Sequence, residues 1–228
     1  MDQLQLRENE VFATLKKLAG HSFVVIGGYA ANAYTLPRFS VDCDIVAERP
    51  EAEMIGRALE RLGYIRTEMR AGERTGFARY EKSVGASYRV SFDIMIGEVY
   101  DRQTGVRIGY RWIFDNSQVM VLKGKTIRNR LKVRVVGPDA LFVMKIISCR
   151  AADIRDLFMM AFSIRDKKWI KREVSSRFDF SNRLRKVENA VSEGKFRDGL
   201  QGVYGLIDGS TFERNLRIIK SFRDIDIQ

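Results

Sequence analysis

The stretch Phe23–Ala47, FVVIGGYAANAYTLPRFSVDCDIVA, decides how the rest of the chain is interpreted. An apolar run ends at Gly27 and Gly28, which predicts a strand followed by a sharp turn with uncovered backbone N–H groups. The segment from Tyr29 to Tyr34 suits a short helix, and a helix N-terminus behind bare amides favours phosphate binding. The stretch therefore predicts a strand, a turn and a helix that together receive an anion.

Two carboxylates follow on the next predicted strand, Val41–Val46. Because side chains alternate along a strand, Asp42 and Asp44 share one face, while Cys43 and Ile45 point to the other. Two neighbouring carboxylates repel each other unless a cation lies between them. Hard oxygen ligands on a rigid strand suit Mg²⁺, which takes few protein ligands and shares phosphate oxygens. The pattern predicts a magnesium site beside the phosphate-binding turn.

These residues resemble the motif of the nucleotidyltransferase superfamily that includes DNA polymerase beta. Its pattern is hydrophobic-Gly-Gly/Ser, about ten residues, and Asp-hydrophobic-Asp/Glu-hydrophobic. The matching residues here are Ile26-Gly27-Gly28 and Asp42-Cys43-Asp44-Ile45, and the segment between them is at the long end for the family. The segment Arg38–Asp44 also resembles the Arg-x-Thr/Ser-x-Asp-x-Asp form found in the branch with AbiEii-type toxin nucleotidyltransferases.

A third carboxylate, Asp93, lies in the predicted strand Tyr88–Ile96. The neighbouring apolar side chains at 90, 92 and 94 share one face, which places Asp93 on the other face. The superfamily has a third carboxylate on a strand beside the Asp-x-Asp strand, and Asp93 matches it. The alternative is an aspartate on an edge strand that faces solvent, although strands are otherwise poor in Asp.

A second informative stretch is KIISCRAADIRDL, residues 145–157. It resembles an AbiEii-like signature in which a Lys heads one helix, an Arg follows, and Lys-Asp-hydrophobic-x-Asp-hydrophobic starts the next helix. Lys145, Arg150, Asp153 and Asp156 match this signature, whereas Ala152 replaces the usual Lys. The resemblance implies that Lys145 contacts a triphosphate. The alternative is a surface ion-pair ladder of the arginine and the two acids, which would contribute little to stability.

The resemblance implies a metal-dependent enzyme that transfers NMP from an NTP to a hydroxyl group and releases pyrophosphate. The three strand carboxylates would hold two Mg²⁺ ions, with Mn²⁺ as a substitute, and Asp93 would act as the base or orient it. The predicted catalytic residues are Asp42, Asp44, Asp93 and Lys145, the first three being the metal ligands. The predicted nucleotide-binding residues are Gly27, Gly28, Arg38, Ser40, Lys145 and Asp156.

The order of elements predicts an α+β fold. The resemblance implies a small mixed sheet with flanking helices, the nucleotidyltransferase fold, followed by a helical C-terminal region. Expected strands include 64–69, 76–82, 88–96, 108–114, 118–122 and 131–136, with a hairpin around Gly72 and expected helices at 3–19 and 50–62. We expect a catalytic domain at 1–137 and a helical domain at 138–228.

Two further features lie in the C-terminal region. Gly199, Gly202 and Gly205 recur at a three-residue step, which fits either a loosely turning segment or close helix packing. The sequence Ser210–Glu213 matches a capping box and predicts the start of the last helix.

The net charge of +11, from 40 Lys and Arg against 29 acids, favours polyanionic partners such as tRNA or other RNA. A solvated basic surface is the alternative. Cys43 and Cys149 suggest free thiols in a cytoplasmic protein, the single histidine argues against zinc, and no apolar run is long enough for a membrane span.

Three functions remain open at this stage. The first is a transferase acting on a nucleic acid, with a toxin role and an antitoxin partner implied by analogy. The second is a transferase acting on a small molecule such as an antibiotic. The third is a non-catalytic nucleotide- or RNA-binding module on the same fold.

Overall fold

The computed structural model describes residues 3–68, 76–85 and 88–226, which form two compact units. Unit 1 contains residues 1–33, 37–100 and 107–136, and unit 2 contains residues 34–36, 101–106 and 137–228. The predicted hairpin loop around Gly72 lies outside the described residues. The described part of the chain contains no helix with the length and apolar character needed to cross a membrane.

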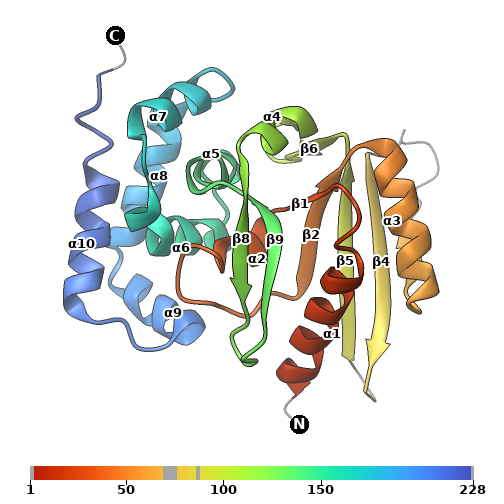
Figure 1. The fold of residues 1–228 in the computed structure, drawn as a ribbon. Coiled ribbons are helices and arrows are strands. Elements are labelled where there is room, and N and C mark those ends of the chain that lie inside the picture. Colours follow the sequence, from red (N-terminus) through yellow and green to blue (C-terminus); the bar gives the residue numbers. More distant parts are fainter. Residues whose placement is uncertain (1–2, 69–75, 86–87, 227–228) are drawn as a thin grey trace. The chain divides into compact units, whose positions relative to one another are not determined.

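Unit 1 is built on a mixed seven-stranded sheet in the order β3-β4-β5-β2-β1-β9-β8 (Figure 1). The strands are β1 (Val24–Val25), β2 (Asp42–Ala47), β3 (Ile65–Glu68), β4 (Phe77–Val84), β5 (Tyr88–Ile96), β8 (Ser117–Lys123) and β9 (Arg130–Val136). Two pairs, β2 with β5 and β1 with β9, are parallel, and the other neighbours are antiparallel. A separate two-stranded sheet pairs β6 (Glu98–Tyr100) with β7 (Arg107–Gly109). The predicted mixed sheet is confirmed.

The helices of unit 1 are α1 (Gln3–Lys17), α2 (Gly27–Ala31), α3 (Arg49–Arg61) and α4 (Tyr110–Asp115). Helix α1 buries Val11 and Leu15, and α3 buries Ile55 and Leu59, at the spacing of an amphipathic helix. These apolar faces meet the sheet and form the core of the unit.

The predicted strand at 108–114 is wrong, because α4 occupies most of that segment. The alternating large side chains of that segment resemble a strand pattern. However, Tyr110 and Ile113 are the residues of α4 that are buried, and their spacing of three fits one face of a helix. Helix α2 also begins at Gly27 itself, two residues before the predicted start, so the two glycines form its first turn.

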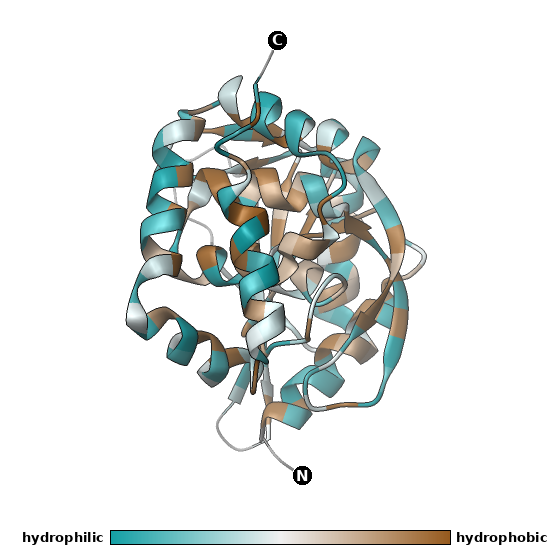
Figure 2. Cartoon of the chain, turned by 90° about the vertical axis from the view of Figure 1, so that its left-hand side faces the viewer, coloured by the Kyte–Doolittle hydropathy of each residue, from teal (hydrophilic) through white to brown (hydrophobic). Residues whose placement is uncertain are grey.

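Unit 2 is helical, as predicted for the C-terminal region. Its helices are α5 (Pro138–Ser148), α6 (Ala151–Met160), the 3₁₀ helix η1 (Ala161–Ser163), α7 (Lys167–Ser175), α8 (Phe180–Ser192), α9 (Gly194–Tyr204) and α10 (Gly209–Lys220). Hydrophilic and hydrophobic residues alternate along these helices (Figure 2). In α8, for example, Leu184, Val187 and Val191 are buried. This periodicity gives each helix one apolar face for packing.

Aspartates outside the predicted capping box start three of these helices. Asp166, Asp179 and Asp208 each accept a hydrogen bond from the backbone N–H three residues later, at α7, α8 and α10. The predicted cap at Ser210 is therefore wrong, since Asp208 holds that position. The glycines at 199 and 202 lie within α9, where an added Cβ would meet nothing within 4 Å, so they do not mark close helix packing.

Candidate active site

The three predicted metal-binding carboxylates lie on two adjacent parallel strands of unit 1. Asp44 of β2 is in register with Asp93 of β5, and Asp42 is in register with Ser91. Alternate residues of a strand, and residues paired across strands, point to the same side of a sheet. Asp42, Asp44 and Asp93 therefore share one face. The edge-strand alternative for Asp93 is wrong, because β5 lies between β4 and β2 and Asp93 is only 6% exposed.

Arg79, on β4, lies against two of these carboxylates and was not anticipated from the sequence. Its Nε donates to Asp93 Oδ1 over 2.7 Å, and its Nη2 donates to Asp93 Oδ2 over 2.6 Å. The same Nη2 is 3.9 Å from Asp42 Oδ1, and the Ser91 hydroxyl donates to that oxygen. A guanidinium binds a carboxylate strongly in this bidentate form. Arg79 thus supplies positive charge between the two aspartates in this structure.

The Gly27-Gly28 pair lies directly beside this carboxylate face. Gly27 has a φ of +64°, and a Cβ at this position would overlap the Asp44 carboxylate. A Cβ at Gly28 would overlap the Ser40 hydroxyl and lie 2.9 Å from Arg38 Nη2. Gly27 is therefore required by both its backbone conformation and the close approach of Asp44. Five of the predicted site residues are brought together around this turn.

The loop that carries Arg38 and Ser40 is held by Asn32, a residue that sequence reasoning missed. The Asn32 amide donates to Arg38 O over 2.8 Å and accepts from Arg38 N over 3.0 Å, and Asn32 is buried. Ser40 Oγ also donates to Asp42 O over 3.3 Å. These contacts fix the loop relative to the start of β2. An Asn that bonds both backbone groups of one residue gives no sequence signal, because the pairing depends on the fold.

The donor chemistry of the carboxylate face fits Mg²⁺. Carboxylate oxygens are the ligands this ion prefers, and it commonly uses one or two of them together with substrate phosphates. Cys43 lies on the opposite face, and burial, followed by the nearby aspartate charges, raises the pKa of its thiol well above the usual value. Because it points away from the face of the three aspartates, this thiol is not among the candidate ligands. Among the described residues, no group of three or more acidic, His or Cys side chains is arranged to hold a metal ion, and both oxygens of Asp93 accept hydrogen bonds from Arg79.

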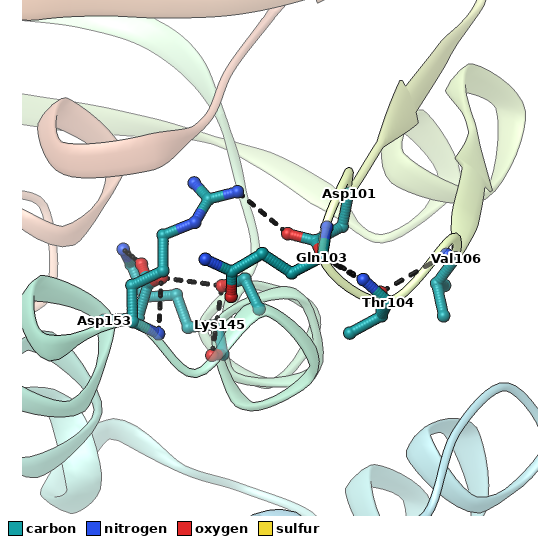
Figure 3. Close-up of polar contacts among 8 residues, drawn as sticks. Asp101, Gln103, Thr104, Val106, Lys145 and Asp153 are labelled. Carbon is teal, nitrogen blue, oxygen red and sulfur yellow. Dashed lines mark hydrogen bonds and ion pairs between the residues drawn. The ribbon is translucent and has the colours of Figure 1, made fainter.

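A second polar cluster lies in unit 2 and contains Lys145 (Figure 3). Lys145 Nζ is 3.0 Å from Asp153 Oδ1 and 2.8 Å from Asp156 Oδ2, and Lys145 is 5% exposed. Burial lowers the pKa of this ammonium, but the charges of Asp156 and Asp153 outweigh that effect and raise it overall. The Lys145 ammonium is therefore shared between two carboxylates.

The same cluster ties the start of α6 to neighbouring elements of unit 2. Asp153 also accepts from Ser148 Oγ over 2.7 Å, and the fully buried Asp156 accepts from the Tyr204 hydroxyl. Arg150 pairs instead with Asp101, whose carboxylate also caps the loop at 103–104 (Figure 3). The surface-ladder alternative is wrong, because the two acids bind Lys145 and the arginine binds a different acid.

The solved structures that this chain resembles include two of low similarity. The antibiotic-resistance factor ANT(2'')-Ia is 12% identical with a TM-score of 0.38, over 95% of this chain and 94% of that chain. The CdnE cyclic dinucleotide synthase of Elizabethkingia meningoseptica, with GTP and Apcpp, is 11% identical with a TM-score of 0.31, over 96% of this chain and 92% of that chain. No family model and no curated protein matches the chain. Likenesses at this level carry no argument about activity.

Proposed function

We propose that this chain is a metal-dependent nucleotidyltransferase of the type that includes DNA polymerase beta, moving NMP from an NTP to a hydroxyl acceptor. One observation carries the proposal. Asp42 and Asp44 on β2 share a sheet face with Asp93 on β5, and Asp44 lies against Gly27. Carboxylates on one face beside a glycine turn provide a cation site next to an anion site, which is what an NTP with its metal requires.

The glycine turn and its surrounding loop form the proposed phosphate-binding side. Backbone N–H groups of Gly27 and Gly28 would donate to the β- and γ-phosphates. The side chains of Arg38 and Ser40 lie next to Gly28, and they would contribute a guanidinium and a hydroxyl to phosphate binding. Helix α2 has only five residues, so these contacts depend on individual groups, not on a helix dipole.

The carboxylate face forms the proposed metal-binding and proton-accepting side. Asp42, Asp44 and Asp93 would hold Mg²⁺, which when bound neutralises the phosphate charge in the transition state. Asp93 would also accept the proton of the attacking hydroxyl or orient the group that does. Both Asp93 oxygens accept hydrogen bonds from Arg79 in this structure. Arg79 would therefore compete with the metal ion and with the attacking hydroxyl for the Asp93 carboxylate.

The predicted phosphate contact of Lys145 stays a prediction. Its ammonium bonds to two carboxylates, so contact with a triphosphate would require it to leave one of them. Asp156 is fully buried and also bonds to Tyr204. The contacts of Lys145 and Asp156 support a structural role instead. They hold α5 to α6 and would keep the helical unit of the proposed enzyme ordered.

For the acceptor, we propose a nucleic acid, with tRNA or another RNA as the first candidate. The net charge of +11 supports this choice, because a basic field attracts polyanions and disfavours a cationic antibiotic. A toxin role, with an antitoxin as partner, is the remaining part of the proposal and rests on the AbiEii-like motifs alone.

The test is transfer of label from each α-³²P-NTP to total RNA in Mg²⁺, with the Asp42→Ala/Asp44→Ala double variant as control. Labelled RNA with wild type and none with the variant supports the proposal and names the nucleotide. Pyrophosphate release only with small hydroxyl compounds would replace the nucleic-acid acceptor with a small molecule. NTP binding without any transfer, across RNA and small acceptors, would favour a non-catalytic module.

A further inference from the structure

The β8–β9 hairpin carries a concentrated positive charge that the proposed active site does not use. Residues 123–134 contain six Lys or Arg and no acidic residue. These are Lys123, Lys125, Arg128, Arg130, Lys132 and Arg134; the first five are exposed and the last is half-buried. More than half of the chain's net charge of +11 therefore lies in one hairpin at the edge of the sheet (Figure 1).

The register of the hairpin gathers four of these cations on one face. Lys123 pairs with Arg130 across the strands, and Lys132 and Arg134 follow along β9 on the same side as Arg130. On the opposite face, Leu122, Val133 and Val135 are buried in the core. The cations along β9 are spaced by two residues, about 7 Å. They form a regular row that we call the basic row, Lys123, Arg130, Lys132 and Arg134.

The described residues provide no acidic partner for three members of this row. Within the described residues, no ion pair involves Lys123, Arg130 or Lys132, and like charges directly opposite each other destabilise a strand pair. The face also presents little apolar surface, since Val119 is its exposed large aliphatic residue. Uncompensated charge with little apolar area suits contact with phosphates more than docking of a folded protein.

The turn of the hairpin is held in place by a buried acid from α1. Glu8 is fully buried, and its carboxylate accepts from Lys125 N over 2.7 Å, Thr126 N over 2.6 Å and Thr126 Oγ1 over 2.6 Å. A carboxylate that accepts several backbone N–H bonds is strongly bound. The basic row therefore lies on a preorganised hairpin, which lowers the entropic cost of binding a flexible chain.

The row lies on the same sheet face as the carboxylates. Val25 of β1 pairs with both Ile45 of β2 and Val135 of β9, so those three side chains share a face. Because side chains alternate along each strand, Asp44 and Arg134 lie on the other face. A chain bound along the basic row would therefore run on the face of unit 1 that carries the proposed catalytic residues.

We propose that the basic row is the surface that binds the phosphodiester backbone of an RNA acceptor. This inference deepens the proposed function, since it names where the acceptor is held, but RNA binding can be measured without catalysis. Contacts to phosphates fix the position of an RNA without reading its bases. The row therefore binds RNA of mixed sequence, and its contribution decreases as salt increases.

The test compares two triple variants that remove the same charge from unit 1. The first is Lys123→Gln/Arg130→Gln/Lys132→Gln. The matched control is Lys16→Gln/Lys17→Gln/Arg57→Gln, whose three side chains are exposed on α1 and α3. Binding of fluorescein-labelled total tRNA is measured by anisotropy from 50 to 300 mM KCl, in EDTA and without NTP. Circular dichroism and thermal unfolding check that each variant folds.

The slope of log K against log salt is negative, and loss of three phosphate contacts should make it less steep by about 2. The control triple should have a slope close to that of wild type. Equal losses in both triples, no binding of tRNA by wild type, or equal competition by polyglutamate of matched charge would each overturn the inference. Binding through the row together with failed label transfer would reject the proposed activity and keep the RNA surface.

Discussion

Arg79 donates two hydrogen bonds, of 2.7 and 2.6 Å, to the two carboxylate oxygens of Asp93 across the β4–β5 pair. The two residues are paired directly across the strands, so the antiparallel register of β4 and β5 brings their side chains together. The guanidinium also lies 3.9 Å from Asp42. One arginine thus compensates two of the carboxylates proposed to bind the metal, and its removal should change how the protein binds cations.

Replacing Arg79 with alanine should increase the affinity for Mn²⁺ by about tenfold, because a positive charge beside the ion is lost. The metal-free variant should unfold at a lower temperature, since repulsion between Asp42 and Asp93 is no longer offset. Titration calorimetry with Mn²⁺ and thermal unfolding with and without the ion measure both effects. Arg89→Ala, which breaks the exposed pair with Glu81 on the same two strands, is the control. Unchanged Mn²⁺ affinity in the Arg79 variant would contradict this role.

Gly27→Ala should weaken Mn²⁺ binding as well as stability. The new Cβ would overlap the Asp44 carboxylate and displace it, and the φ of +64° is unfavourable for alanine. Gly97→Ala separates the two effects, because Gly97 has a φ of +77° but a Cβ there meets nothing within 4 Å. Both variants should lose about 1 to 2 kcal/mol from backbone strain. Only the Gly27 variant should lose Mn²⁺ affinity, and equal affinities in the two would disprove the proposed link to Asp44.

Lys145→Met should destabilise the protein by about 3 to 5 kcal/mol, because Asp153 and Asp156 are left without their buried counter-charge. Urea unfolding measures the loss, and Lys16→Met at an exposed position of α1 is the control. A loss of less than about 1 kcal/mol would show that the two acids find other partners.

The same variant gives a prediction for pH. The folded-state pKa of Lys145 is raised above its value in the unfolded chain, about 10.4. The stability that the charged ammonium contributes is therefore complete below that value and is lost as pH rises through the folded-state pKa. The stability difference between wild type and Lys145→Met should be constant from pH 8 to 10 and decrease above that range. A constant difference up to pH 12 would contradict the raised pKa.

Glu8→Gln should loosen the turn of the β8–β9 hairpin, because both carboxylate oxygens of Glu8 accept hydrogen bonds there, whereas a glutamine amide has one acceptor oxygen and an NH₂ group that only donates. Amide hydrogen exchange at Lys125 and Thr126 should accelerate by about tenfold, which corresponds to about 1.4 kcal/mol. Glu53→Gln on the exposed side of α3 is the control. Exchange at the turn that matches wild type would show that strand pairing alone holds the hairpin.

Local pattern was sufficient for much of the fold and for which of the candidate site residues share a sheet face. The Gly-Gly turn, the Asp-x-Asp strand and the strand with Asp93 are short segments whose alternation fixes which side chains share a face, and β5 was predicted with its observed bounds. The segment at 108–114 failed because alternating aromatic residues fit a strand as well as a short helix. The cap of α10 failed because two candidate capping residues lie two positions apart.

By itself, then, the sequence determined that a glycine turn precedes paired carboxylates, and that strands give way to helices at Pro138. Only the tertiary structure decided what surrounds those groups. In the tertiary structure, Arg79 binds Asp93, and Lys145 is buried between Asp153 and Asp156. The basic row lies on the same sheet face as Asp44. The reason is that these relationships depend on register and packing between segments distant in the chain, whereas periodicity reports only on neighbours within a segment.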